Sequence, residues 1–217
     1  MWLFMLMRQQ GAGSAICFEF GLMRINEIFY SLQGEGYWTG TPAVFVRFSG
    51  CNLKCGFCDT EHGGFVDMSE EEIVAAVNSF PARHVVLTGG EPTLQISVSL
   101  LSRLKGYGKY VQIETNGTIS VSEKALEMID WVTCSPKDMP VVIGRVDEVK
   151  MVFENPQQDM DYATRLAANH GALAMLQPCD VKDGLRNREI VSAAVEYVKS
   201  HPVWRLSLQT HKMLDIR

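Results

Sequence analysis

The feature that most limits the fold of this chain is an alternation, from residue 43 to residue 209, of short apolar runs with longer segments of helical periodicity. The short runs are rich in β-branched and aromatic residues, which are typical of strands, and strands that alternate with helices form a mostly parallel sheet. The expected strands are 43–48, 84–88, 110–115, 131–134, 147–153, 172–178 and 204–209. The first expected helix begins at a capping box formed by Ser69 and Glu72. The other expected helices are 94–104, 121–129, 159–169 and 188–200.

Length and composition fit one domain with a substantial core. The 217 residues are 47% hydrophobic, and the sequence has no internal repeat or low-complexity linker. A net charge of −5 and a pI near 5.6 argue against a nucleic-acid-binding surface, which needs a basic patch. No apolar run approaches the roughly 20 residues of a membrane-spanning helix. We therefore expect a cytoplasmic protein that binds neither nucleic acid nor membrane.

The first 22 residues stand apart from the rest of the chain. Their apolar start, MWLFMLM, is only seven residues long, and Arg8 follows it. A secretory signal has its positive charge before the apolar stretch and a longer apolar stretch. The stretch has no clear periodicity, although a short helix that packs on the rest of the chain is an alternative. We expect residues 1–22 to be a poorly ordered extension, Met23 to be the natural start, and residues 23–217 to form a single catalytic domain.

Three clustered cysteines are the strongest functional feature. Cys51, Cys55 and Cys58 have the spacing C-x3-C-x2-C, and thiolate is the ligand that soft metals and iron–sulfur clusters select. Three thiolates on a four-iron cluster leave one iron free to bind a substrate or cofactor. With His62 the same run is a candidate Cys3His zinc site, which would be structural. The other cysteines, which are scattered and which we expect to be buried and inert, are Cys17, Cys134 and Cys179.

Polar, turn-like segments follow five of the expected strands. They are the cysteine run, GGEP at 89–92, ETNG at 114–117, SPK at 135–137 and QPCD at 177–180. In barrel-like α/β folds the loops after the carboxyl ends of the strands form the active-site face. Each segment alone is consistent with an ordinary turn, but five of them at one edge of the sheet predict a site there.

These motifs resemble those of a known superfamily and, within it, of one family. The cysteine run and TGGEPTL at 88–94 resemble the two motifs of the radical S-adenosylmethionine superfamily. The segments at 31–52, 58–62, 114–118, 134–137 and 206–212 resemble the 7-carboxy-7-deazaguanine synthase family of queuosine biosynthesis. The resemblance covers residues 23–217. It implies an α/β fold, a partial (open) β/α barrel with a mostly parallel sheet and a reduced set of helices.

The resemblance also implies two cofactors. The three clustered cysteines would bind a 4Fe-4S cluster, and S-adenosyl-L-methionine would chelate the iron that has no protein ligand. One-electron reduction would then release a 5′-deoxyadenosyl radical, and Glu91 would pair with the ammonium of the methionine moiety. No catalytic residue is expected beyond the cluster and the cofactor. The implied S-adenosylmethionine-binding residues are Phe57, Cys58, Asp59, Gly89, Gly90, Glu91, Ser135, Pro136, Lys137, Gln177, Pro178, Cys179 and Asp180.

The implied substrate is 6-carboxy-5,6,7,8-tetrahydropterin. It would lose hydrogen from C6, contract its ring, release ammonia and become 7-carboxy-7-deazaguanine, which is the reaction of a carbon–nitrogen lyase. Arg47 would bind the substrate carboxylate, because a guanidinium fork suits bidentate contacts. The terminal carboxylate of Arg217 would accept hydrogen bonds from the pterin, and Thr60 would bind Mg²⁺, which favours oxygen donors. The implied substrate-binding residues are Leu32, Gln33, Gly34, Arg47, Thr88 and Arg217.

The family further implies a homodimer and a one-electron donor of the flavodoxin or ferredoxin type. Two alternatives stay open. Another small radical enzyme, such as a glycyl-radical activase, would keep the cysteines and GGEP but has no reason for Arg47 or for LSLQTHK at 206–212. A Cys3His zinc module, which is not an enzyme, leaves GGEP and SPK unexplained.

Overall fold

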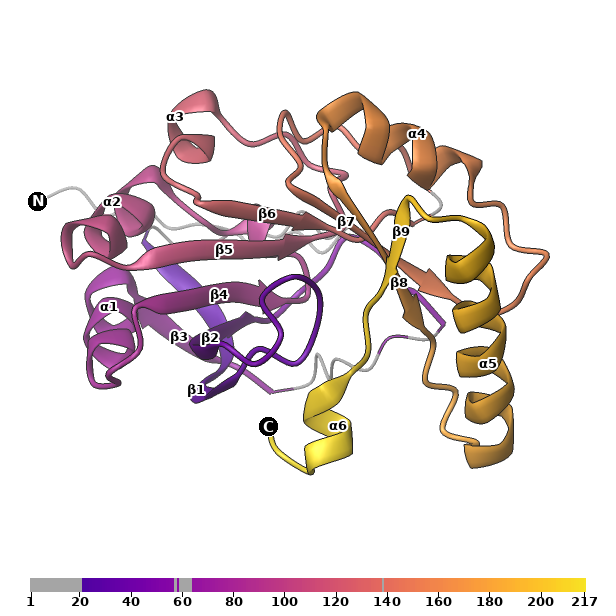
Figure 1. Ribbon diagram of the computed structural model, residues 1–217. Coiled ribbons are helices and arrows are strands. Elements are labelled where there is room, and N and C mark those ends of the chain that lie inside the picture. The colour runs from indigo at the N-terminus through magenta and orange to yellow at the C-terminus, as the bar shows by residue number, and fades with distance from the viewer. Residues whose placement is uncertain (1–20, 57, 59–63, 138) are drawn as a thin grey trace, which may run out of the picture.

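The computed structural model describes residues 21–56, 58, 64–137 and 139–217, which form one curved, open sheet flanked by helices (Figure 1). The strand order is β3-β1-β2-β4-β5-β6-β7-β8-β9, with β3 and β9 at the edges. The strands are β1 (Leu22–Leu32), β2 (Pro42–Phe48), β3 (Val66–Ser69), β4 (His84–Gly89), β5 (Tyr110–Thr115), β6 (Trp131–Cys134), β7 (Glu148–Phe153), β8 (Leu173–Pro178) and β9 (Trp204–Leu206). The helices are α1 (Glu70–Asn78), the short 3₁₀ helix η1 (Pro92–Leu94), α2 (Val98–Gly106), α3 (Glu123–Leu126), α4 (Asp161–His170), α5 (Gly184–Ser200) and α6 (Thr210–Leu214).

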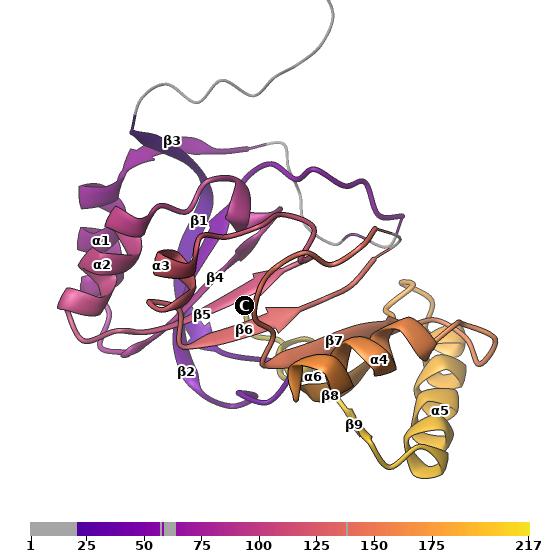
Figure 2. The same cartoon turned by 90° about the horizontal axis from the view of Figure 1, so that it is seen from above.

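Along the sheet, the pairs from β2–β4 to β8–β9 are all parallel, whereas β1 pairs antiparallel with both β2 and β3. Parallel neighbours need crossover connections, and helices supply most of them. Helices α1 and α2 pack beside the β1–β5 half of the sheet, and α4 and α5 pack against β7, β8 and β9 (Figure 2). The carboxyl ends of the parallel strands therefore meet along one edge. This architecture confirms the expected open, mostly parallel α/β fold.

The middle of the sheet is buried on both faces, as its nearly continuous apolar runs predict. In β4, Val85 and Leu87 join the large core that also contains the buried residues of α1 and α2. Val86 between them joins a smaller cluster with Phe29 and Phe45. Because successive side chains of a strand point to opposite faces, this division places the two clusters on either side of β4.

The predicted capping box begins α1. Ser69 Oγ accepts a hydrogen bond from the Glu72 backbone N–H at 3.3 Å, and Glu72 Oε2 accepts one from the Ser69 backbone N–H at 2.8 Å. The two residues thereby satisfy donors at the helix start that have no partner inside the helix.

Two strands were not predicted from the sequence, namely β1 and β3. The polar residues Arg24, Asn26 and Glu27 interrupt the apolar pattern of β1, which lies near the edge of the sheet where side chains reach solvent. Leu94 was expected in the same helix as residue 104 but lies in η1, because Ser97 starts α2 afresh by accepting a hydrogen bond from the Leu100 backbone N–H at 2.9 Å.

Two expected elements are shorter in the structure. Helix α3 covers only Glu123–Leu126 of the expected 121–129, and β9 ends at Leu206 where the expected strand continued to 209. After β9 the chain turns away, and the Thr210 backbone N–H donates to Gly34 O at 2.9 Å. This contact begins α6, which the sequence did not predict.

The N-terminal extension stays a prediction, since residues 1–20 lie outside the described residues. Leu22 is already the first residue of β1, so the sheet begins one residue before Met23, where the domain was expected to start. In the part of the chain that the structure describes, no helix is long and apolar enough to cross a membrane.

Candidate active site

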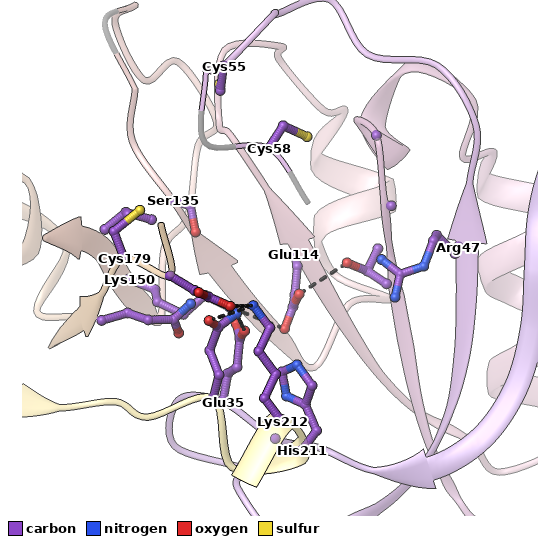
Figure 3. Close-up of a pocket in the computed structure, with 18 of the residues that line it drawn as sticks. Glu35, Arg47, Cys55, Cys58, Glu114, Ser135, Lys150, Cys179, His211 and Lys212 are labelled. Atoms are coloured by element: carbon purple, nitrogen blue, oxygen red, sulfur yellow. Dashed lines mark hydrogen bonds and ion pairs between the residues drawn. The ribbon is translucent and has the colours of Figure 1, made fainter. Parts of the chain in front are cut away.

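A large cavity lies at the carboxyl ends of the parallel strands (Figure 3). Its volume is about 1260 Å³, which exceeds the range of roughly 300–1,000 Å³ that is usual for one small ligand. Residues from the loops after β2, β4, β5, β6 and β8 line it. The structure therefore brings together the five polar segments that the sequence places at this edge.

The three clustered cysteines share the wall of this cavity. Cys51, Cys55 and Cys58 all line it from the loop after β2. The Leu53 backbone N–H donates to Cys51 Sγ at 3.4 Å, and Asn116 Nδ2 lies 4.0 Å from the same sulfur. Burial raises the pKa of the Cys51 thiol despite the hydrogen bond from Leu53. A cationic centre would offset this and hold the thiolate, so the donor set fits an iron–sulfur cluster.

The zinc alternative needs three thiolates and His62 around one ion. Among the residues that the structure describes, no three His, Cys, Asp or Glu side chains are close enough to hold a single ion. His62, the fourth ligand of the zinc alternative, lies outside the described residues.

Two of the scattered cysteines are buried free thiols, as expected. Cys134 on β6 is fully buried, and burial raises its pKa to about 12. Burial also raises the pKa of Cys179, which lies at the cavity wall. Both thiols are poor nucleophiles at neutral pH for this reason. Cys17 lies outside the described residues.

The GGEP segment after β4 packs directly on the start of the cysteine loop. Gly90 N donates to Phe48 O and Glu91 N donates to Gly50 O, each at 2.9 Å. A Cβ atom on Gly90 would overlap the Gly50 carbonyl, and Gly89 has a φ of 113°, which favours glycine. The two glycines therefore allow the backbones of the two loops to touch, and both line the cavity.

Glu91 lies behind the cavity wall. Its fully buried carboxylate accepts hydrogen bonds from Thr93 N at 3.0 Å, Thr93 Oγ1 at 2.6 Å, Thr115 Oγ1 at 2.7 Å and Asn116 N at 2.8 Å. Glu91 thus ties the GGEP segment to the ETNG segment. Glu91 is not among the residues that line the cavity, so its expected ion pair with the ammonium of the methionine moiety stays a prediction. Gly89 and Gly90 of the same loop do line the cavity.

We expect Gly90→Ala to push the GGEP and cysteine loops apart and to lower the iron content of the reconstituted protein. The added methyl group has no room against Gly50, and overpacking of this kind costs about 1–3 kcal/mol. Gly106→Ala is the matched control, because a Cβ there meets nothing within 4 Å and the change favours the helix by up to ~1 kcal/mol. Iron per chain and the melting temperature measure the effect. Wild-type iron content in Gly90→Ala would disprove the coupling of the two loops.

The residues expected to bind the substrate lie around one cavity. They are Leu32, Gln33, Gly34, Arg47, Thr88 and Arg217. Arg47 and Arg217 share one carboxylate, with Arg47 Nε 2.9 Å from Glu27 Oε1 and Arg217 Nη2 2.6 Å from Glu27 Oε2. Both guanidinium groups lie over the Phe29 ring, 5.8 Å and 5.2 Å from its centroid. This Arg–Glu–Arg bridge, formed by Arg47, Glu27 and Arg217, fixes two cations at the cavity wall.

The sequence did not predict a second group of charged residues at the cavity, which contains Glu35, Glu114, Lys150 and His211 (Figure 3). Glu35 and Glu114 lie in the segments that resemble the family, but the resemblance implied no role for either residue. Lys150 had a signal of its own, because a lysine in the otherwise apolar run VKMVF has to find a partner when the strand is buried.

Neutral donors hold the two carboxylates of this group in place. Gln209 Nε2 donates to Glu35 Oε1 at 2.9 Å. Gln33 Nε2 donates to Glu114 Oε1 at 3.0 Å, and Thr88 Oγ1 donates to Glu114 Oε2 at 3.1 Å. Two residues expected to touch the substrate, Gln33 and Thr88, therefore also orient Glu114.

The segments after β6 and β8 complete the wall. The predicted cofactor-binding residues from these segments that line the cavity are Ser135, Lys137, Gln177, Pro178, Cys179 and Asp180. Hydrogen bonds from Lys212, Lys182 and Asn187 hold the pKa of Asp180 well below its usual range. Pro136 lines a smaller neighbouring cavity of about 810 Å³. Three further predicted residues lie outside the described residues, namely Phe57, Asp59 and Thr60.

Known proteins resemble this chain along most of its length. The family model of the radical SAM superfamily matches residues 45–140. The 7-carboxy-7-deazaguanine synthase of Bacteroides thetaiotaomicron is 54% identical over 197 residues, which cover 90% of this chain and 100% of that protein. The synthase of the same name from Burkholderia multivorans is 40% identical and covers 88% of this chain and 98% of its own. The crystal structure of QueE from Escherichia coli matches with a TM-score of 0.71 and 31% identity, over 86% of this chain and 93% of that one. The chain belongs to the 7-carboxy-7-deazaguanine synthase family of the radical SAM superfamily.

Proposed function

We propose that this chain converts 6-carboxy-5,6,7,8-tetrahydropterin to 7-carboxy-7-deazaguanine and ammonia in queuosine biosynthesis. The observation that carries the proposal is one cavity of about 1260 Å³ that joins three cysteine thiols to Arg47 and to two carboxylates. The names of its relatives support the same reaction. When bound, a 4Fe-4S cluster and S-adenosylmethionine supply the one-electron chemistry that removes hydrogen from the substrate.

In this proposal the cysteine end of the cavity holds the cofactors. Cys51, Cys55 and Cys58 bind the cluster, and the backbone of Gly89 and Gly90 approaches the methionine moiety of S-adenosylmethionine. The remaining cofactor contacts come from the loops after β6 and β8. Glu91 supports this end through the hydrogen bonds that tie the GGEP and ETNG segments together. The residues of the chain thus fix the cofactor against the substrate, which is what positioning contributes to such reactions.

The opposite end of the cavity binds the substrate. Arg47 pairs with its carboxylate, because a guanidinium presents two parallel N–H donors to two oxygens. Glu35 and Glu114 accept hydrogen bonds from the N–H groups along the pterin edge, since ionised carboxylates are acceptors only. The apolar walls at Leu32 and Phe29 exclude water beside these contacts.

Further parts of the proposal rest on family membership alone. Thr60 binds Mg²⁺, and Phe57 and Asp59 line the adenosine moiety. The enzyme acts as a cytoplasmic homodimer and receives electrons from a flavodoxin or ferredoxin type of protein. The terminal carboxylate of Arg217 adds a hydrogen-bond acceptor for the pterin.

We expect removal of residues 213–217 to weaken turnover of the pterin while cluster binding and cofactor cleavage persist. The deletion removes the ion pair of Arg217 with Glu27 and the hydrogen bond from Ser31 Oγ to Arg217 O at 2.5 Å. It also removes the terminal carboxylate that is proposed to accept hydrogen bonds from the pterin. Two such hydrogen bonds are worth about 1 kcal/mol each, so kcat/KM should fall roughly 10- to 30-fold. Met213→Ala is the control, because its exposed side chain makes no core contact. Wild-type kinetics in the truncated protein would make this segment a packing element only.

Complementation tests the proposed function in a cell. The chain is expressed in a bacterial strain that lacks its own 7-carboxy-7-deazaguanine synthase, and queuosine is measured in the transfer RNA by mass spectrometry. We expect the wild-type chain to restore queuosine and Cys55→Ala to restore none. If the wild-type chain accumulates with iron bound but restores no queuosine, the proposed substrate is wrong and another radical enzyme, such as an activase, is favoured.

A further inference from the structure

A lysine lies buried at the cavity, and the proposed reaction assigns it no role. Lys150 is on β7, and its side chain is only 6% exposed. Its Nζ pairs with Glu35 Oε2 and lies 3.6 Å from Glu114 Oε1 (Figure 3). A buried ammonium is costly unless partners match its charge. Lys150 is therefore matched to the carboxylates around it.

Three carboxylates from different parts of the chain surround this ammonium. Glu35 follows β1, Glu114 is on β5, and Glu148 is two residues before Lys150 on β7. Glu148 accepts a hydrogen bond from the Tyr37 backbone N–H at 2.9 Å and is not among the cavity-lining residues in the described part of the chain. The cavity thus presents Glu35 and Glu114, which would repel each other without a cation between them.

Both carboxylates still have acceptor positions for a ligand. An ionised carboxylate has about four such positions. Glu35 uses its oxygens for Lys150 and Gln209, and Glu114 uses its oxygens for Lys150, Gln33 and Thr88. Each carboxylate is therefore held in place and remains able to accept a further N–H group from the cavity side.

We infer that Lys150 is a positioning residue that holds the carboxylates of Glu35 and Glu114 on either side of one ammonium, so that both accept N–H groups of the substrate. The inference rests on the proposed function, because the pterin supplies the donor edge. The Lys150 ammonium contacts the two carboxylates and affects the substrate only through them.

The electrostatics of the group agree with this inference. Burial by itself would raise the pKa of Glu35, but the ion pair and hydrogen bond with Lys150, aided by Gln209 and His211, lower it to about 2. Burial would likewise lower the pKa of Lys150, yet Glu114 and Glu35 raise it above its usual value. The other charged groups facing the pair are His211 from α6, Lys137 from the loop after β6, and Glu148. Without Lys150, burial is no longer offset at Glu35, and the pKa of this carboxyl rises.

The test is the pH profile of kcat/KM for the pterin in Lys150→Met, with Lys105→Met as the matched control. Lys105 also pairs with a carboxylate, Asp130 at 2.6 Å, but neither residue lines the cavity. Between about pH 6 and pH 9 we expect wild type and Lys105→Met to share one profile. In Lys150→Met we expect KM to rise at least ~10-fold and kcat/KM to fall further as the pH decreases, because a protonated Glu35 is a weaker acceptor and turns an O–H donor toward the substrate N–H groups. Iron content and S-adenosylmethionine binding should match wild type.

A second variant keeps the inference testable if Lys150→Met folds poorly. Lys150→Met combined with Glu35→Gln also removes the ionisable carboxyl of Glu35, so fewer negative charges remain without their cation. The double variant should hold iron and lose the acid limb that Glu35 adds to the profile of Lys150→Met. Lys150→Arg, which keeps the cation, should restore the wild-type shape of the profile even if its KM is higher.

The outcomes separate this inference from the proposed function. If wild type forms no 7-carboxy-7-deazaguanine, the proposed function fails. If wild type forms it and Lys150→Met has the wild-type KM and pH profile, Lys150 does not position the pair. A fall in kcat that is equal at every pH, with KM unchanged, would assign Lys150 to the chemical step instead. Failure of the double variant to fold would make Lys150 a structural residue. Each of these last three results overturns the inference.

Discussion

Replacing Cys51, Cys55 or Cys58 by Ala is expected to abolish assembly of a competent iron–sulfur cluster and, with it, all cleavage of S-adenosylmethionine. Two thiolates cannot replace three on a cluster whose remaining iron has to stay open for the cofactor. The fold should persist, because these cysteines lie on a loop at the cavity wall and none belongs to the buried core. Iron per chain, the broad charge-transfer absorbance and the melting temperature measure the three parts of this expectation.

Cys134→Ala is the control for the cluster ligands. Cys134 is fully buried in β6 and belongs to the core, so this substitution removes packing but no expected ligand. It should cost about 1 kcal/mol of stability and keep its iron. If Cys134→Ala lost its iron while Cys55→Ala kept a full cluster, the ligand assignment would be wrong.

Arg47→Ala is expected to separate substrate binding from cofactor chemistry. The protein should still bind iron and cleave S-adenosylmethionine unproductively, but a substrate carboxylate would be buried without its charged partner. Losing one partner of such a pair costs about 2–5 kcal/mol, which weakens binding of the pterin roughly 30- to several thousand-fold. Arg47→Lys should recover only part of the affinity, because an ammonium cannot replace the planar fork.

Arg103→Ala is the matched control for Arg47. Arg103 on α2 also pairs with glutamates, Glu70 at 3.4 Å and Glu71 at 2.6 Å, but it is about half-exposed and lies outside the cavity. Exposed ion pairs contribute little, so this variant should bind the pterin as wild type does. Binding is measured by isothermal titration under anaerobic conditions. Unchanged affinity in Arg47→Ala would remove Arg47 from the substrate site.

Local sequence patterns predicted the fold where burial dictates the residue types. Strands β4, β5 and β8 are buried on both faces, so their apolar runs are nearly continuous and easy to recognise. Strand β1 was missed because it pairs near an open edge, where Glu27 and Arg24 reach solvent or ion-pair partners. Helix α6 was missed because its start depends on a hydrogen bond to Gly34, which is 176 residues away in sequence.

The candidate site was predictable where one segment carries a whole motif. The cysteine run reveals itself by its spacing, and the GGEP segment by its resemblance to the second motif of the superfamily. The group of Glu35, Glu114 and Lys150 does not, because its members come from three separate elements and meet only when the sheet curves. The motif around Glu91 predicts a ligand contact, which stays a prediction, but it does not reveal the four hydrogen bonds by which the Glu91 carboxylate joins two loops.

Product analysis with the purified chain tests the central claim most directly. The protein is reconstituted anaerobically with iron and sulfide and then given reductant, S-adenosylmethionine, Mg²⁺ and 6-carboxy-5,6,7,8-tetrahydropterin. We predict one 7-carboxy-7-deazaguanine and one ammonia for each pterin consumed, and none of either from Cys55→Ala. Cleavage of S-adenosylmethionine by the iron-loaded protein with no deazaguanine formed would contradict the account.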